Sequence, residues 1–355
     1  MDQPPASATP RRRAILDLIL LAVIGALLAA AIWAGFSALH RQFWGPSAFV
    51  ERYLATLADG DAGAALAIPG VAIDTTELEE AGLPATASDA LLRRAVLTYD
   101  LADVEIVRES TADGVTEVTA TYAIDGTAGE TTFRVRRSGT EGLVPRWTFE
   151  TSPLGEIEVA LRGSRQFTVN GFAIDQRQVS PDGAAADPLD PVALLVFTPG
   201  LYSVGVDTAT AEADPVNVLA DAALKSVPLE IQTTPTKEFT EVVSEKVSSF
   251  LGTCATQKVL QPTGCPFGMR IDDRVLPDTL EWSITSQPLV QIVPSGAFWE
   301  IAAATGTAHL EADVRSIFDG SVYRFSEDVP FVIDGTVEIL PDGTASILVG
   351  SPALR

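Results

Sequence analysis

The chain has 355 residues, a net charge of −23, 46% hydrophobic residues, two cysteines and two histidines. This length is sufficient for more than one hydrophobic core. The acidic balance repels phosphate backbones, so nucleic acid is excluded as an expected partner. The abundant alanine and the preference for arginine over lysine indicate a GC-rich bacterial genome.

Residues 14–41 are predicted to form a transmembrane anchor. Leu18 to Leu39 contains no charged residue and no proline, and at about 1.5 Å per residue it could cross a hydrocarbon core of roughly 30 Å. Arg11, Arg12 and Arg13 precede it and predict that residues 1–13 are a cytoplasmic tail. We therefore expect a single-pass plasma-membrane protein with an extracytoplasmic C-terminal region. A cleavable signal peptide is the alternative, although its apolar region is usually only about 7–15 residues.

Residues 46–152 are predicted to form an α+β domain. A helix beginning at Pro46 is followed by a break at Gly60-Asp61, a short helix over Ala62 to Ile68, and a third helix over Ala90 to Val96. Apolar and polar residues then alternate up to Phe149, which indicates half-buried antiparallel strands. Three dipeptides are expected to turn the chain between these strands: Asp113-Gly114, Asp125-Gly126 and Ser138-Gly139.

The run AFVERYLATLADGDAGAALAI and the later RWTF segment resemble the nuclear-transport-factor-two-like (cystatin-like) cone. The resemblance implies helices packed against a curved four-stranded sheet. Some cones of this shape are isomerases or cyclases that use an acid pair or an Asp–His pair. This segment has no histidine, so four of its acids are expected to be turn and surface residues: Asp59, Asp61, Asp100 and Asp103.

Residues 155–234 are predicted to form a small β-sandwich. The Asn170-Gly171 pair suits a tight hairpin, Val192 to Phe197 reads as an apolar strand, and short strands follow at the spacing of a sandwich. The phrases FTVNG and FTPGLYSVGV are similar to those in immunoglobulin-like or PEGA-like modules of envelope proteins. Such folds serve both binding and spacer roles.

Residues 236–351 are predicted to form a second cone-like α+β domain. Thr236 is expected to cap a helix that runs toward Cys254, and Asp319-Gly320, Asp334-Gly335 and Asp342-Gly343 are expected to turn the following strands. Four aromatic residues are expected in the core of its sheet: Trp282, Phe298, Trp299 and Phe318.

Cys254 and Cys265 are predicted to form a disulfide, because an even pair in an exported region has that role most often. A zinc site is the alternative. It is disfavoured because the chain has only His40 and His309 to add as ligands and has no CxxC spacing.

No catalytic, cofactor-binding or metal-binding residue is predicted. The sequence has none of the common hydrolase, metalloprotease, nucleotide-binding or kinase motifs. His309, with Glu311 two residues later, is expected on the polar face of a strand. Asp272-Asp273-Arg274 lacks the spacing of a calcium loop and is expected to be a solvated turn.

The order of an anchor, α+β modules and a β module resembles TcaA-type envelope proteins, although the cysteine-rich zinc ribbon of that family is missing before the anchor. The resemblance implies a role at the cell wall. We expect a membrane-anchored, non-enzymatic binding or sensor protein that contacts lipid through one span and a protein or cell-wall partner through its exported modules. Two alternatives are an accessory structural subunit of a membrane complex and a small-molecule carrier or isomerase-like cone.

Overall fold

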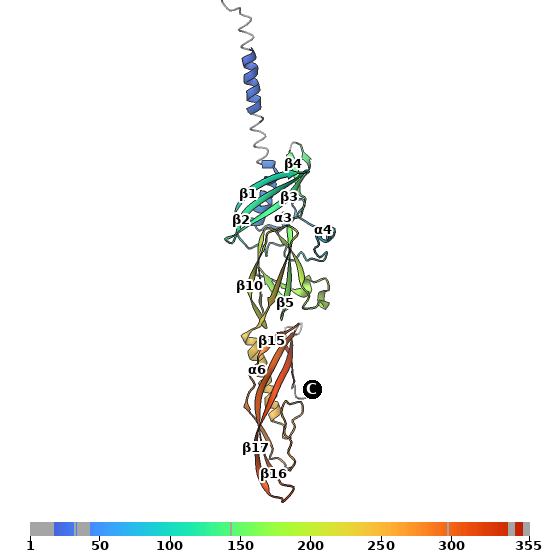
Figure 1. Ribbon diagram of the computed structural model, residues 1–355, viewed down its shortest axis with the longest axis vertical. Helices are drawn as coiled ribbons and strands as arrows, with labels where there is room; N and C mark the ends of the chain where they lie inside the picture. Colours follow the sequence, from blue (N-terminus) through green and yellow to red (C-terminus); the bar gives the residue numbers. More distant parts are fainter. Residues whose placement is uncertain are drawn as a thin grey trace, which may run out of the picture. The chain divides into compact units, whose positions relative to one another are not determined.

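The protein is described by a computed structural model that covers residues 18–31, 33, 43–142, 144–296, 298–339 and 345–350. It is an α+β chain, mostly strands in four sheets, with few helices (Figure 1). The chain divides into two compact units. Unit 1 contains residues 1–74, 97–154 and 221–224, and unit 2 contains residues 75–96, 155–220 and 225–355.

The prediction of a transmembrane helix is corrected by the structure. Among the described residues, no helix is both long and apolar enough to cross a membrane. Residues 14–17, 32 and 34–41 of the predicted anchor lie outside the described part of the chain.

The core of unit 1 lies between two helices and a four-stranded antiparallel sheet. Phe49 and Tyr53 lie on the buried face of the first helix, and their rings pack against Phe149 at centroid distances of 5.0 and 5.2 Å. Phe133 completes this cluster. The helices are α2 (Pro46–Ala58) and α3 (Ala62–Leu66), and the strands in sheet order are β1 (Leu101–Ala112), β2 (Val115–Ile124), β3 (Thr127–Glu141) and β4 (Val144–Phe149).

Two of the three predicted turns in this sheet are confirmed. Asp113-Gly114 and Asp125-Gly126 connect neighbouring strands, with positive φ at all four residues, as tight hairpins require. The turn predicted at Ser138-Gly139 is wrong, because both residues lie inside β3. The pairing of β3 with β4 instead has a register shift between Arg137 and Gly139. A glycine in an alternating stretch can mark such a bulge inside a strand as well as a turn between strands.

The first part of unit 2 contains two sheets. One has five strands and the other has three, in which β11 and β5 run parallel. Phe167, Phe197 and Tyr202 are among its fully buried side chains. The five-stranded sheet has the order β12 (Thr234–Pro235), β10 (Ala211–Ala220), β9 (Gly200–Asp207), β6 (Gln166–Val169), β7 (Phe172–Asp175), and the three-stranded sheet has the order β11 (Ser226–Gln232), β5 (Leu154–Arg162), β8 (Val192–Phe197).

The helix predicted over Ala90 to Val96 is wrong. This segment consists of turns, and Ser88 instead forms a parallel bridge with Leu194 of β8. Pairing with a strand edge outweighs the helical spacing of a segment this short. The helix in this region is α4 (Thr75–Glu80), and two other short helices of unit 2 are α5 (Gln176–Val179) and η1 (Gly183–Ala185).

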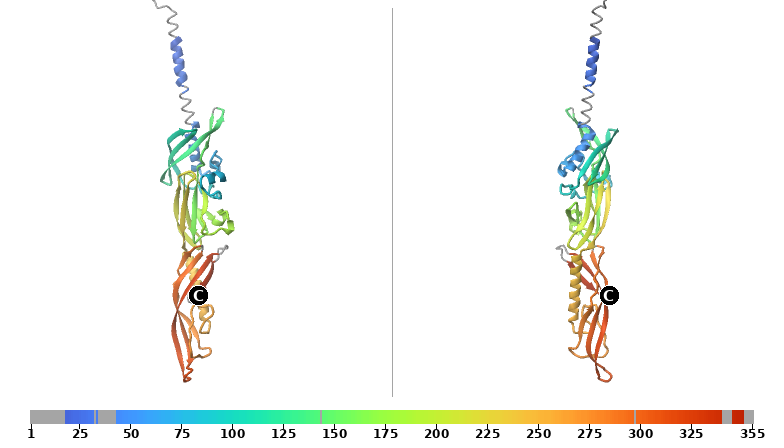
Figure 2. Two further views of the ribbon diagram at one scale, coloured as in Figure 1. Left: turned by 45° about the vertical axis from the view of Figure 1, so that its right-hand side comes forward. Right: turned by 90° about the vertical axis from the view of Figure 1, so that its left-hand side faces the viewer.

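The last part of unit 2 packs one long helix against a six-stranded sheet (Figure 2). Thr236 caps α6 (Lys237–Ala255), since its side chain accepts a hydrogen bond from the Phe239 N–H. The ring of Phe239 packs on that of Trp299. Strand β16 lies at the centre of the sheet, whose strands are β13 (Arg274–Val275), β14 (Glu281–Ser286), β15 (Ile292–Ser295), β16 (Phe298–Arg315), β17 (Val322–Ile339) and β18 (Ala345–Gly350).

Two details of this sheet differ from expectation. Asp319-Gly320 lies in the β16–β17 turn as predicted, but Asp334-Gly335 lies inside β17. Asp342-Gly343 lies outside the described residues. Trp282 and Trp299 are buried as predicted, whereas Phe318 is 94% exposed. The predicted fold of a membrane span, two cones and a sandwich is therefore corrected to an α+β chain dominated by four sheets.

Candidate functional site

The structure joins the two cysteines in a disulfide. Cys254 lies in the last turn of α6, Cys265 lies in the following loop, and both side chains are buried. Gln257 braces the loop, because it accepts from the Thr263 N–H at 2.8 Å and donates to the Thr263 carbonyl. Within the described ranges, no group of three or more potential ligands has the arrangement of a metal site. Arg11, Arg12 and Arg13 lie outside those ranges.

A serine, a histidine and an aspartate meet on the outer face of β16 and β17. The His309 Nδ1 atom lies 2.7 Å from Asp328 Oδ1, and its Nε2 atom lies 3.1 Å from Ser326 Oγ. Arg324 lies beside this cluster and donates to Glu311 at 2.6 Å and to Asp313 at 3.2 Å. A hydrogen-bonded Ser–His–Asp series is the arrangement that activates serine nucleophiles.

Among the described residues, the surroundings of this cluster do not complete an acyl-transfer site. His309 and Asp328 are directly opposite each other in a regular ladder, and Ser326 is exposed. Successive N–H groups of an extended strand point to opposite edges, so they do not converge on one oxyanion position beside Ser326. We interpret the cluster as cross-strand polar pairing that favours this register.

The most exposed apolar side chains of the β16–β17 hairpin are found at its tip. Phe318 is 94% exposed and Ile317 is 66% exposed, and Val322 follows where β17 begins. A buried position is the usual place for phenylalanine and isoleucine, and a cluster of exposed apolar residues often marks an interaction site.

The tip is a defined turn held by its own polar groups. The Ser316 N–H donates to the Ser321 carbonyl at 2.9 Å, and Ser316 Oγ accepts from the Phe318 N–H at 3.2 Å. Asp319 accepts from both the N–H and the hydroxyl of Ser321. The hydroxyl and backbone hydrogen bonds from Ser321 lower the pKa of Asp319, so this carboxylate is charged at neutral pH.

A neighbouring loop braces the same tip. Asp273 accepts from the Ile317 N–H at 3.1 Å and from the Tyr323 hydroxyl at 2.9 Å. The hydrogen bond to Asp273 raises the pKa of Tyr323, which keeps this donor protonated. Arg274 and Arg315 pair across β13 and β16 beside it. Asp273 therefore helps to hold the backbone of the turn that presents Ile317 and Phe318.

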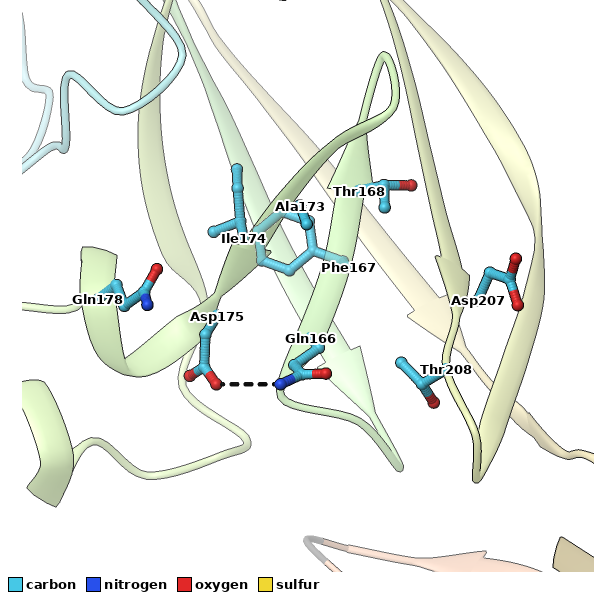
Figure 3. A pocket seen from close by; sticks show the side chains of 9 residues that line it. All are labelled: Gln166, Phe167, Thr168, Ala173, Ile174, Asp175, Gln178, Asp207 and Thr208. Carbon is cyan, nitrogen blue, oxygen red and sulfur yellow. Dashed lines mark hydrogen bonds between the residues drawn. The ribbon is translucent and has the colours of Figure 1, made fainter. Parts of the chain in front are cut away.

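A separate pocket lies beside the β6–β7 hairpin (Figure 3). Its volume is about 230 Å³. Gln166 and Asp175 stand on one side, and Asp207 and Thr208 stand on the other. The other lining residues are Phe167, Thr168, Ala173, Ile174 and Gln178.

One carboxylate of the pocket is neutralised within the protein. The Arg177 guanidinium donates to both oxygens of Asp175, at 2.9 and 2.6 Å. These hydrogen bonds lower the pKa of Asp175, with a further contribution from the Arg177 N–H. Asp207 is exposed at the end of β9, with no cationic side chain paired to it in the described part of the chain.

Neither the tip nor the pocket was predicted. Phe318 was expected in the core of the sheet together with three other aromatic residues. The signal that could have revealed its exposure is the Ile317-Phe318 pair placed directly before the Asp319-Gly320 turn. The pocket has no comparable signal, since its lining residues come from separate strands.

Comparisons of this chain with protein-family models, with curated proteins and with solved structures find no match.

Proposed function

We propose that the protein is a non-enzymatic binding protein of the bacterial cell envelope that works outside the cytoplasm and holds a partner protein through the tip of the β16–β17 hairpin. The observation that carries this proposal is the exposure of Phe318 on a turn fixed by hydrogen bonds. A rigid aromatic anchor loses little conformational entropy on binding, so it is well suited to fill a pocket on a partner.

The disulfide supports an extracytoplasmic location, because such bonds persist in oxidising compartments and are rare in the bacterial cytosol. The composition of the tip supports a protein partner. Aromatic side chains are enriched at the energetic centres of protein interfaces, and Phe318 is 94% exposed at the tip. Insertion into a lipid bilayer would carry the ionised Asp319 along with Phe318, which is costly.

The proposal is tested with a photo-crosslinking amino acid placed at position 318 of the full chain in intact native cells. A matched control carries the same group at Leu289, which is 76% exposed elsewhere in unit 2. We expect one protein to be crosslinked from position 318 and not from position 289. The purified partner should then bind the Phe318→Ala variant at least tenfold more weakly than the parent, while Leu289→Ala binds normally.

Two results would contradict the proposal. One is equal crosslinking from the two positions, and the other is an unchanged affinity of the identified partner for Phe318→Ala. If the chain sediments with anionic vesicles and the Phe318→Ala variant does not, the tip binds a membrane surface and the proposed protein partner is wrong.

A further inference from the structure

The pocket beside the β6–β7 hairpin exists because two strands of one sheet separate. Strand β6 pairs with β9 only through Thr168 with Gly205 and Val169 with Val204. Toward Gln166 and Asp207 the ladder stops, and the pocket occupies this divergence. The opening is therefore a consequence of the sheet itself, and all of its lining residues belong to unit 2.

The size of the pocket limits its ligand. A volume of about 230 Å³ is somewhat below the roughly 300–1,000 Å³ of pockets for drug-sized molecules, so a single substituted ring fits better than a larger ligand. Phe167 and Ile174 pair across β6 and β7 and are 2% and 3% exposed. Both line the pocket, so part of its floor is apolar.

The polar groups of the rim divide into those that are engaged and those that remain available. The Thr208 hydroxyl donates to the Ala211 carbonyl and accepts from the Ala211 N–H, both at 2.9 Å, so it shapes the turn that follows Asp207. Within the described residues, the side-chain amide of Gln166 has only a long contact of 3.5 Å with Asp175. Gln178 adds a second amide from α5 (Figure 3). Two amides can each donate to and accept from ligand hydroxyls.

The charge of the pocket favours a cation. Arg177 compensates Asp175, which leaves the Asp207 carboxylate as the charge that a ligand can neutralise. Because Asp207 directly precedes the hydrogen-bonded turn at Thr208, its backbone position is fixed before a ligand arrives. We propose that this pocket binds a small, hydroxyl-rich ring that carries a primary ammonium group, with the Asp207 carboxylate as its charge partner.

The test compares three sugars that share a ring and differ in charge: glucosamine, glucose and glucuronate. Binding to the purified full chain is measured by calorimetry and by saturation-transfer NMR, at pH 6 and 150 mM NaCl, where the amine is protonated and long-range attraction is screened. We expect glucosamine to bind at least tenfold more tightly than glucose, and glucuronate not to bind.

Variants assign the effect to the pocket. Asp207→Asn should reduce the affinity for glucosamine to that for glucose. The matched control is Asp214→Asn, because Asp214 is an exposed acid of the neighbouring strand β10 outside the pocket. This control should bind all three sugars as the parent does. Gln178→Ala should lower the affinity for glucosamine and for glucose by the same factor.

Three outcomes would overturn the inference: equal affinity for all three sugars, a preference for glucosamine that survives in Asp207→Asn, or no binding of any sugar at 10 mM. The Phe318→Ala variant should retain glucosamine binding, so failure here and failure of the proposed partner site are distinguishable.

Discussion

At the scale of single residues, Asn170 forms the β6–β7 turn and also connects three segments of unit 2 through its side chain. Its backbone adopts φ of 49°, as the turn requires. Its side-chain amide donates to the carbonyls of Val96 and Leu201 at 2.8 and 3.0 Å, while its oxygen accepts from the Ser203 N–H at 2.7 Å. One side chain thus joins the 75–96 segment to β6 and β9.

Asn170→Asp is predicted to destabilise the protein by about 2–3 kcal/mol, because a carboxylate cannot donate to the two carbonyls and repels them. Urea denaturation at pH 7 measures the change in the free energy of unfolding. Asn217→Asp is the control, since Asn217 is exposed on β10, and it should change stability by less than about 0.5 kcal/mol. Equal effects of the two substitutions would refute this role of Asn170.

Glu156 is a buried acid on β5, only 1% exposed, and its Oε2 atom lacks a hydrogen-bond partner among the described groups. Burial raises its pKa, the hydrogen bond with Ser226 opposes this, and Glu158 adds to it. The folded state therefore binds this proton more tightly than the unfolded state does. Its contribution to stability is fully present below the unfolded pKa and is lost as the pH rises through the folded pKa.

Glu156→Gln should remove this dependence. We expect the variant to be more stable than the parent at pH 8, with the difference shrinking toward pH 4, as measured by urea denaturation across that range. Glu230→Gln, at an exposed position of the adjacent strand β11, is the control. Its free energy of unfolding should change with pH in the same way as that of the parent. A Glu156→Gln curve parallel to that of the parent would contradict the prediction.

At the scale of elements, apolar spacing predicted the type of the long segments and failed where a short segment has competing partners. Thr236 and the helical spacing after it define α6, and Asp113-Gly114 defines the β1–β2 turn. The same rules misplaced a helix over residues 90–96, where pairing of Ser88 with β8 prevails. They also placed a turn at Asp334-Gly335, whose residues pair with both β16 and β18.

The disulfide at the end of α6 is expected to contribute to stability mainly by restricting the unfolded chain. Its loop spans a sequence separation of 11, for which the chain-entropy model gives about 2–3 kcal/mol. The Cys254→Ala, Cys265→Ala double variant should lose that amount in guanidinium denaturation. The reducing agent dithiothreitol should lower the stability of the parent and leave that of the double variant unchanged; an effect of the same size on both would show that it acts elsewhere.

At the scale of the whole molecule, the dominant feature is a net charge of −23. Like charges at this density repel one another and oppose the compact state, and dissolved salt screens that repulsion. The same negative charge is expected to disfavour nucleic acid and anionic polymers as partners. Its negative potential concentrates small cations at the surface, which agrees with the ammonium ligand that we propose.

Raising NaCl from 10 to 200 mM should therefore increase the melting temperature by a few degrees, because the Debye length falls from about 30 Å to less than 10 Å. Calorimetry at pH 7 checks this. A neutral osmolyte at matched osmolality, which does not screen charge, should leave the melting temperature closer to its low-salt value. A melting temperature that is independent of salt would show that the acidic residues are already compensated in the fold.

The sequence by itself determined the α+β class, most of the long elements, two hairpin turns of unit 1 and the cysteine pair, because periodicity, turn residues and cysteine usage are local or compositional signals. Tertiary structure alone decided that Phe318 is exposed, that His309, Ser326 and Asp328 meet, and that a pocket opens where β6 leaves β9. Each of these depends on strand register and on where pairing stops. Register is set by contacts between residues far apart in the chain, which no local pattern encodes.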